Sequence, residues 1–226
     1  FRRVLFRSPQ PQQVPSLRDA RVVGVPLRTA ITNLDRHARR AEARARFGLR
    51  PDLPVLFVFG ASQGARSINL AIAGAARAVT RAGIQVLHII GARNADVEIP
   101  SDLPVPYVKL PYLDHMELGY AAADLVLSRG GAMTCAELAA VGLPAIYVPY
   151  PYSNQEQRRN ALPVVEAGGG MLVDDSLMTP EWIEKNVIDL ALDSQRLAAM
   201  GAAAARYGRR DGDEALRQFV LEVLYK

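Results

Sequence analysis

Ser128-Arg-Gly-Gly-Ala-Met-Thr-Cys-Ala-Glu137 joins an apolar run to a run of helical composition through a turn of small residues. The preceding residues, Ala123–Leu127, are short, branched and mostly apolar, as in a parallel strand that is covered on both faces. The residues that follow, Met133–Val141, favour a helix. The first N–H groups of a helix favour phosphate oxygens, because they have no partners within the helix and lie at its positive end. The stretch therefore predicts a strand, a turn and a helix with an anion site at the turn.

Three small residues and one carboxylate of this stretch are candidates for binding a nucleotide diphosphate. Gly130, Gly131 and Ala132 leave room for a ligand to approach the backbone closely. Glu137 lies about one turn into the helix, where its carboxylate can accept hydrogen bonds from ribose hydroxyls. The alternative is an ordinary turn in which Thr134 caps the helix.

A second turn of the same kind follows an earlier apolar run. Val55–Phe59 is an apolar strand that runs into Gly60-Ala-Ser-Gln-Gly-Ala65, before an alanine-rich helix that begins near Ile68. Ser62 and Gln63 can both donate hydrogen bonds to phosphate or sugar oxygens. The loop matches neither the Walker A pattern nor the full dinucleotide fingerprint. Because ligands of open parallel sheets bind outside the carboxyl ends of the strands, both turns are expected at the same edge of one sheet.

A third polar turn follows the apolar run Leu143–Pro149. Pro151–Ala161 is a polar loop that enters a helix. Gln157 and Asn160 are three residues apart and share a face of that helix, with Glu156 beside them. Their amide and carboxylate groups could bind sugar hydroxyls, and the alternative is a solvated start of a helix.

The rest of the chain extends the same alternation of strands and helices. The 226 residues allow one or two domains, and the 50% hydrophobic content is enough for a sizeable core. Val22–Val25 is the first interpretable strand, and Thr179-Pro180 opens a helix by the rule of a cap followed by proline. Further helices are expected at about 194–207 and 211–225. The expected fold is α/β, a Rossmann-like parallel sheet with helices on both faces.

The positive charge of the chain is concentrated in one helical segment. The net charge is +4 and the isoelectric point is about 9.4, and the excess lies in Arg36, Arg39, Arg40, Arg44, Arg46 and Arg50. The segment lacks aromatic residues on which bases could stack. It therefore favours a solvated helix or a contact with an anionic surface over a nucleic-acid site. No apolar run approaches the ~18 residues of a membrane span, and no secretory signal is apparent.

Cysteine and histidine form neither a catalytic nor a metal-binding pattern. Cys135 has no histidine near it in sequence and is interpreted as a small, buried, apolar residue. His37, His88 and His115 are too scattered to indicate a metal site. His115 is interpreted as an exposed loop residue. We expect neither a metal nor a cofactor.

Six motifs, in this order, resemble the MurG family of bacterial transferases from about residue 20 to the C-terminus: Gly24-x-Pro26-x-Arg28, Gly60-Ala-Ser-Gln-Gly-Ala65, Tyr112-Leu-Asp-His-Met116, the stretch from Ser128 to Glu137, Gly142-Leu-Pro-Ala145 and Gln157-x-x-Asn160-Ala161. The resemblance implies the C-terminal half of a two-domain GT-B glycosyltransferase. Such an enzyme moves N-acetylglucosamine from UDP-N-acetylglucosamine to a lipid-linked muramyl pentapeptide in peptidoglycan synthesis. The resemblance also implies a cytoplasmic location at the inner face of the cell membrane, with a peripheral membrane contact for the full-length protein.

The resemblance further implies a donor site with a role for each residue. These are Ala132, Met133, Thr134, Ser62 and Arg28 for the diphosphate, Glu137 for the ribose, the backbone of Leu113 and Met116 for the uracil, and Gln157 for the sugar. Four neighbouring residues complete the candidate site: Gln63, Arg129, Glu156 and Asn160.

One part of the family pattern has no counterpart here. Nothing in residues 1–20 resembles the family's first half, which has a glycine-rich loop near the acceptor and a hydrophobic patch that meets the membrane. We expect residues 1–20 to be a linker or a cloning or sequencing scar, and residues 21–226 to be the donor-binding domain. The acceptor-binding domain and the general base are expected to be absent, which would leave a fragment that binds the donor without transferring the sugar.

Two alternatives belong to other classes of protein. The chain could be the donor-binding subunit of a two-chain glycosyltransferase, or a non-catalytic module that binds nucleotide sugars. A related two-domain enzyme such as a UDP-sugar epimerase is not expected, because no acid/base constellation can be assembled from these residues.

Overall fold

The computed structural model describes residues 22–60, 65–152 and 154–225. Within these residues, six parallel strands form one sheet: β1 (Val55–Phe59), β2 (Gln85–Ile89), β3 (Tyr107–Leu110), β4 (Leu125–Ser128), β5 (Ala145–Tyr147) and β6 (Gly170–Leu172). The predicted strands at 55–59, 123–127 and 143–149 are confirmed as β1, β4 and β5, with shifted bounds for the last two.

The strand order is β3-β2-β1-β4-β5-β6. From β1 the chain adds β2 and β3 on one side and then returns to add β4, β5 and β6 on the other. Phe57 of β1 is therefore paired with Leu87 of β2 on one side and with Val126 of β4 on the other. This order is that of a Rossmann-like doubly wound sheet, and its direction reverses between β1 and β4. The carboxyl ends of β1 and β4 therefore border the crevice in which such sheets bind ligands.

Helices connect the strands, and side chains at several of their starts fix the boundaries. They are α1 (Thr29–Thr32), α2 (Arg36–Arg46), α3 (Arg66–Gly74), α4 (Ala76–Arg81), α5 (Met116–Ala122), α6 (Ala132–Ala140), α7 (Glu156–Glu166), α8 (Pro180–Leu192), α9 (Ser194–Tyr207) and α10 (Gly212–Leu224), with the short 3₁₀ turns η2 (Ala92–Asn94) and η3 (Asp175–Leu177). The hydroxyl of Thr179 accepts a hydrogen bond from the backbone of Trp182 at 3.2 Å, and Pro180 follows the cap. The predicted start of a helix at Thr179-Pro180 is thereby confirmed. The helices predicted at about 194–207 and 211–225 are confirmed as α9 and α10.

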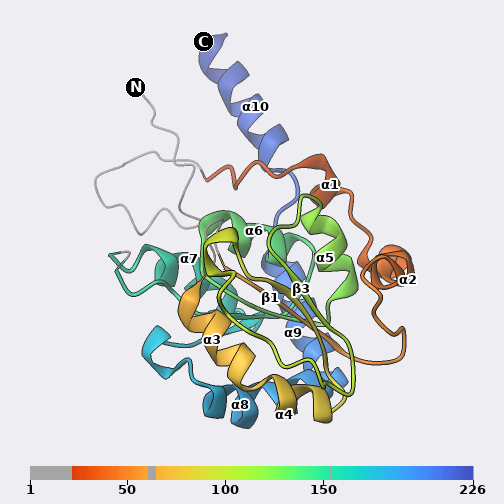
Figure 1. Cartoon of the computed structure of the whole chain (residues 1–226). Helices are drawn as coiled ribbons and strands as arrows, with labels where there is room; N and C mark the ends of the chain where they lie inside the picture. Colours follow the sequence, from red (N-terminus) through yellow and green to blue (C-terminus); the bar gives the residue numbers. More distant parts are fainter. Residues whose placement is uncertain (1–21, 61–64, 153, 226) are drawn as a thin grey trace.

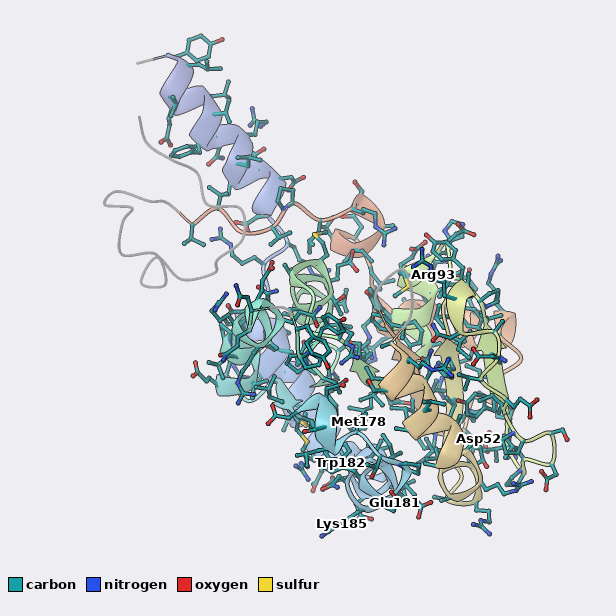
Figure 2. The ribbon with its side chains drawn as sticks, turned by 60° about the vertical axis from the view of Figure 1, so that its left-hand side comes forward. Asp52, Arg93, Met178, Glu181, Trp182 and Lys185 are labelled. Carbon is teal, nitrogen blue, oxygen red and sulfur yellow. The ribbon has the colours of Figure 1, made fainter. Side chains whose placement is uncertain are left out.

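Alternate residues of the strands pack into two separate cores. Phe57 and Phe59 join the cluster beneath α1, α2, α5, α6 and α7, whereas Leu56 and Val58 join the cluster beneath α3, α4 and α8. Figure 2 shows this second side, where Met178 and Trp182 mark the start of α8. The sheet is therefore covered on both faces, as its continuous apolar strands predict.

The prediction of a first strand at Val22–Val25 is wrong. Val22 forms only an isolated bridge, and the residues from Val23 to Arg28 have no regular structure. Gly24 has a φ of +83°, and Pro26 has no N–H to donate, so the segment cannot continue a ladder. It packs instead against the start of α10, where a Cβ on Gly212 would lie 2.5 Å from the carbonyl oxygen of Val25.

The arginines of α2 also differ from the expectation of a solvated or surface-binding helix. Arg44 is 2% exposed, and the guanidinium of Arg36 donates to the carbonyl oxygens of Tyr120, Ala123 and Gly142 at 2.7–3.0 Å. Burial lowers the pKa of Arg36 to about 10. Because Tyr120 and Ala123 lie at the end of α5, the cation also meets the negative end of that helix. These two arginines join α2 to the rest of the fold.

The helix α10 extends away from the body of the fold (Figure 1). Its valines Val220 and Val223 are 43% and 52% exposed, whereas Phe219 is buried. Within the described residues, no helix is both long and apolar enough to cross a membrane.

Candidate functional site

The candidate site lies at the carboxyl edge of the sheet. Figure 2 labels Arg93, which follows β2, and Asp52, which precedes β1, and these residues mark the carboxyl and amino edges. Of the two turns predicted to meet at the carboxyl edge, the one after β4 is described completely. Ser62 and Gln63 of the other turn lie outside the described residues.

The start of α6 offers backbone N–H groups that no side chain caps. Gly131 is the N-cap residue, with φ −63° and ψ 146°, and no side chain makes a capping hydrogen bond there. The alternative in which Thr134 caps the helix is therefore wrong. The N–H groups of the first turn, from Ala132 to Thr134, lie at the positive end of a nine-residue helix. This geometry favours an anion.

The two glycines of the turn have different environments. A Cβ on Gly131 would have Thr134 Oγ1, at 3.6 Å, as its nearest neighbour, so the backbone here is open. A Cβ on Gly130 would lie 2.5 Å from the carbonyl oxygen of Gln157. The predicted space for a ligand is therefore present at Gly131. At Gly130 the space is filled by the backbone of α7, which packs closely against the turn before α6. The side-chain nitrogen of Asn160 donates to the Gly130 carbonyl at 3.2 Å and holds the same contact.

Glu137 lies one turn further along α6, and its side chain is held from two sides. It is 7% exposed. The hydroxyl of Tyr120 donates to its Oε2 at 2.7 Å, and Nη2 of Arg28 lies 3.6 Å from its Oε1. The side chain of Arg28 is 53% exposed, so this cation can also meet a ligand. The structure therefore brings together Arg28, Glu137 and the open start of α6.

The residues predicted to hold a uracil lie at the start of α5. Met116 is its first residue, Leu113 precedes it, and both are partly buried against the core of this face. His115 is exposed, as predicted, and its Nδ1 lies 3.0 Å from Glu117 Oε1. The apolar side chains of Leu113 and Met116 thus fix the backbone of this segment at the carboxyl edge of the sheet.

The residues predicted to bind a sugar lie at the start of α7. Gln157 and Asn160 are both partly buried and contact Gly130, which confirms their shared face, whereas Glu156 is exposed. The side-chain oxygen of Gln157 accepts from the backbone N–H of Tyr150 at 2.8 Å and holds the loop after β5. Asn154 and Gln155, just before the helix, have φ values of 49° and 59°. Left-handed backbone at residues other than glycine is strained and recurs at binding sites.

Arg129, another residue of the predicted site, is buried and joins four segments. Its guanidinium donates to the carbonyl oxygens of Val148 and Pro149, to the hydroxyl of Ser67 at 2.9 Å, and to the carboxylate of Asp175. Ser67 also donates to Asp175 at 2.6 Å. We call Arg129, Ser67 and Asp175 the arginine cluster. Sequence reasoning missed Ser67 and Asp175, although Asp175 follows the end of a strand and so belongs to the same edge of the sheet.

Cys135 is buried, and the described residues include no metal-binding cluster. Burial raises the pKa of the Cys135 thiol to about 12, which agrees with a small buried residue and not a nucleophile. Across the part of the chain that is described, no group of three or more histidine, cysteine, aspartate and glutamate residues could hold a metal ion.

Comparison with known proteins places the chain in a family. Residues 55–216 match the model of the glycosyltransferase family 28 C-terminal domain. The chain is 53% identical over 210 residues to the UDP-N-acetylglucosamine--N-acetylmuramyl-(pentapeptide) pyrophosphoryl-undecaprenol N-acetylglucosamine transferase of Thermobifida fusca, covering 92% of this chain and 55% of the relative. It is 57% identical over 205 residues to the protein of the same name from Mycolicibacterium paratuberculosis, covering 90% and 50%. The chain thus spans about half the length of the curated relatives it matches.

Solved structures share the fold at low sequence identity. MurG of Acinetobacter baumannii superposes with a TM-score of 0.71 at 22% identity, over 89% of this chain and 57% of the other. The UDP-GlcNAc 2-epimerase of Neisseria meningitidis, bound to UDP-GlcNAc, superposes with a TM-score of 0.58 at 14% identity, over 85% and 51%. These likenesses establish the arrangement of the sheet and its helices, which is that of a GT-B domain.

Proposed function

The chain belongs to glycosyltransferase family 28, and we propose that it forms the donor-binding half of an N-acetylglucosaminyltransferase of peptidoglycan synthesis. The observation that carries this proposal is the open start of α6 with Glu137 one turn further along, at the point where the strand order reverses. The relatives' names give the donor as UDP-N-acetylglucosamine and the acceptor as a lipid-linked muramyl pentapeptide.

In this proposal the diphosphate binds at the start of α6. The N–H groups from Ala132 to Thr134 donate to phosphate oxygens, and the exposed guanidinium of Arg28 faces the same anion. Glu137 accepts hydrogen bonds from the ribose hydroxyls. The backbone of Leu113 and Met116 holds the uracil, beside the start of α5.

The sugar then lies toward the start of α7. Gln157, Asn160 and Glu156 are the side chains of that turn proposed to bind the sugar, and Asn160 already fixes the backbone of Gly130 beside α6. Arg129 of the arginine cluster donates hydrogen bonds to the carbonyl oxygens of Val148 and Pro149. It therefore holds the loop after β5, which leads to the start of α7.

The chemistry asked of these residues is stabilisation of the leaving group. An acceptor hydroxyl oxygen attacks the anomeric carbon while the bond from that carbon to the diphosphate oxygen breaks, and negative charge collects on the departing UDP. Helix N–H groups and Arg28 offset that charge in fixed positions. The proton of the attacking hydroxyl passes to a base on the acceptor side, outside the described residues.

The acceptor side belongs, in this proposal, to a second domain that packs against the carboxyl edge of the sheet. The whole enzyme would act in the cytoplasm at the inner face of the membrane, where its lipid-linked acceptor lies, and would touch that membrane peripherally. The exposed valines of α10 would contact the second domain. Whether this domain is part of the same chain or a partner subunit is decided by the coding sequence upstream.

Co-crystallisation with UDP tests where the donor binds. We expect phosphate oxygens within hydrogen-bonding distance of the N–H groups of 132–134 and the ribose hydroxyls at Glu137. Nucleotide bound elsewhere, or with its ribose turned away from Glu137, would overturn the proposed site.

A further inference from the structure

The side chain of Glu137 depends on a residue from another helix for its position. Tyr120, in α5, is 1% exposed, and its hydroxyl donates to Oε2 of Glu137 at 2.7 Å. The other carboxylate oxygen, Oε1, lies on the side of the exposed Arg28, at 3.6 Å from its guanidinium. One oxygen is thus held by the core, and the other lies beside a group that solvent and ligands can reach.

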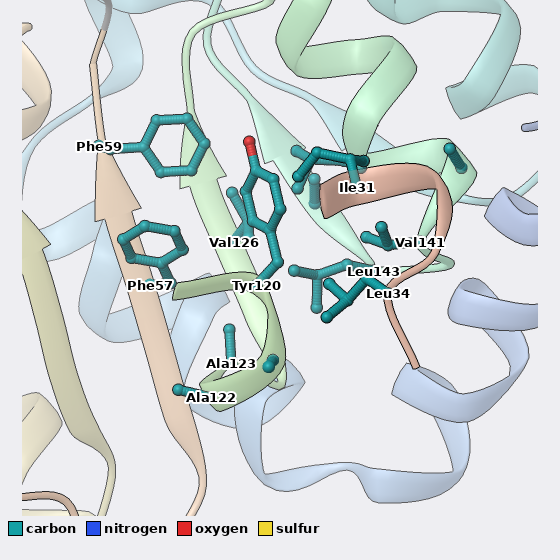
Figure 3. Close-up of a cluster of buried hydrophobic side chains, with 14 of the residues drawn as sticks. Ile31, Leu34, Phe57, Phe59, Tyr120, Ala122, Ala123, Val126, Val141 and Leu143 are labelled. Carbon is teal, nitrogen blue, oxygen red and sulfur yellow. The ribbon is translucent and has the colours of Figure 1, made fainter. Parts of the chain in front are cut away.

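The ring of Tyr120 is itself fixed by the core. Its centroid lies 6.1 Å from that of Phe57 and 6.2 Å from that of Phe59, with interplanar angles of 64° and 50°. Both phenylalanines come from β1, the strand at which the sheet order reverses. Figure 3 shows the tyrosine ring beside Phe57, Phe59 and Ile31, with its hydroxyl at the end remote from Ala122 and Ala123. The central strand therefore sets the position of the hydroxyl.

The hydroxyl acts as a donor toward Glu137. Burial and the neighbouring carboxylate keep the pKa of Tyr120 well above its usual value. The phenol therefore keeps its proton and donates a hydrogen bond, which the Glu137 carboxylate accepts. Without this bond, the terminal torsion of a glutamate is broad and roughly two-fold, so the carboxylate would have to be ordered when a ligand binds.

We propose that Tyr120 is a positioning residue for ribose recognition: its hydroxyl fixes the carboxylate of Glu137 so that Oε1 is presented to the ribose diol. This inference rests on the proposed function, in which Glu137 reads the ribose. It extends that site to a residue of α5 that never touches the nucleotide.

Calorimetry with UDP and 2′,3′-dideoxy-UDP tests the inference on Tyr120→Phe, which removes only the hydroxyl. We expect the affinity for UDP to fall about threefold to tenfold, the equivalent of one hydrogen bond, while the affinity for the dideoxy ligand stays unchanged. Tyr147→Phe is the matched control, because Tyr147 is fully buried and its hydroxyl has no partner among the described residues. That control is expected to change neither affinity.

The outcomes separate this inference from the proposed function. Glu137→Gln should remove most of the preference of the wild type for UDP over the dideoxy ligand; if the wild type has no such preference, or the variant keeps it, both ideas fail. If Glu137→Gln loses the preference and Tyr120→Phe keeps it in full, only the role of Tyr120 is overturned. Equal losses for both ligands in Tyr120→Phe, with a lower Tm, would show a packing role and would also overturn it.

Discussion

At the scale of single residues, Glu137 is buried and yet lies beside an exposed cation. The residue is 7% exposed, and its carboxylate accepts a hydrogen bond from Tyr120 and lies near the exposed Arg28. A buried carboxylate needs such partners, because an unpaired one is costly. The position of Glu137 in the first turns of α6 could be predicted from the sequence. The contribution of Tyr120 could not, since it lies on another helix and no local spacing connects the two.

Glu137→Ala is expected to weaken UDP binding by about 1.5–3 kcal/mol, the range for hydrogen bonds to a charged group. Glu137→Asp should lose part of that, because its side chain is one methylene shorter. Calorimetry measures both variants. A ligand without ribose hydroxyls is the control: if Glu137→Ala discriminates against it as strongly as the wild type does, Glu137 does not read the ribose.

At the scale of elements, the two glycines after β4 have separate tasks. Gly130→Ala would place a Cβ 2.5 Å from a backbone oxygen of α7, so it should lower the free energy of unfolding by about 1–3 kcal/mol. Gly131→Ala is the matched control, since its nearest neighbour would lie at 3.6 Å, and it should leave the fold intact. Denaturant unfolding of the two variants decides this, and equal stabilities would contradict the packing of α6 against α7.

The arginine cluster connects the loops that form the site. Asp175→Ala removes the partner of the buried Arg129, so it should destabilise the fold by about 3 kcal/mol and weaken donor binding. The neighbouring Asp174→Ala is the control, because its pair with Arg158 is exposed and exposed pairs contribute little. Thermal unfolding and UDP titration measure both effects. Equal thermal stabilities and equal UDP affinities of the two variants would show that the arginine cluster does not stabilise the fold.

The elements differ in how well the sequence predicts them. The strands β1 and β4 and the helices α8 and α9 are confirmed because continuous apolar runs and a cap followed by proline are local signals. The prediction of a strand at Val22–Val25 is wrong because the three valines satisfy the apolar pattern, while Gly24 and Pro26 prevent a ladder. The arginines of α2 look solvated by composition, yet two of them bind carbonyl oxygens of segments that only the tertiary fold brings close.

At the scale of the whole molecule, the strand order explains why distant motifs meet. The turn after β4 lies beside the end of β1 because the sheet reverses there. The sequence predicts that both turns share an edge, and β1 and β4 are indeed adjacent and parallel. The motif residues Ser62 and Gln63 remain a prediction, and so does the role of each residue toward a ligand.

The chain alone is expected to show no sugar transfer above background. Orientation of both substrates between two walls can account for roughly 7–11 kcal/mol of barrier lowering, and in the proposed function the described residues form the donor wall. Labelled UDP-N-acetylglucosamine and lipid-linked muramyl pentapeptide are incubated with the chain, and then with the matching acceptor domain added. Transfer by the chain alone would show that catalysis resides elsewhere than proposed, whereas rescue by the added domain supports the donor role.

The most direct measurement is a calorimetric titration of UDP-N-acetylglucosamine into the chain in the presence of EDTA. Because helix N–H groups and Arg28 are proposed to neutralise the diphosphate, we predict saturable binding to one site that does not change when magnesium replaces EDTA. Binding that appears only with a divalent cation, or no binding under either condition, would contradict the proposed donor site at the start of α6.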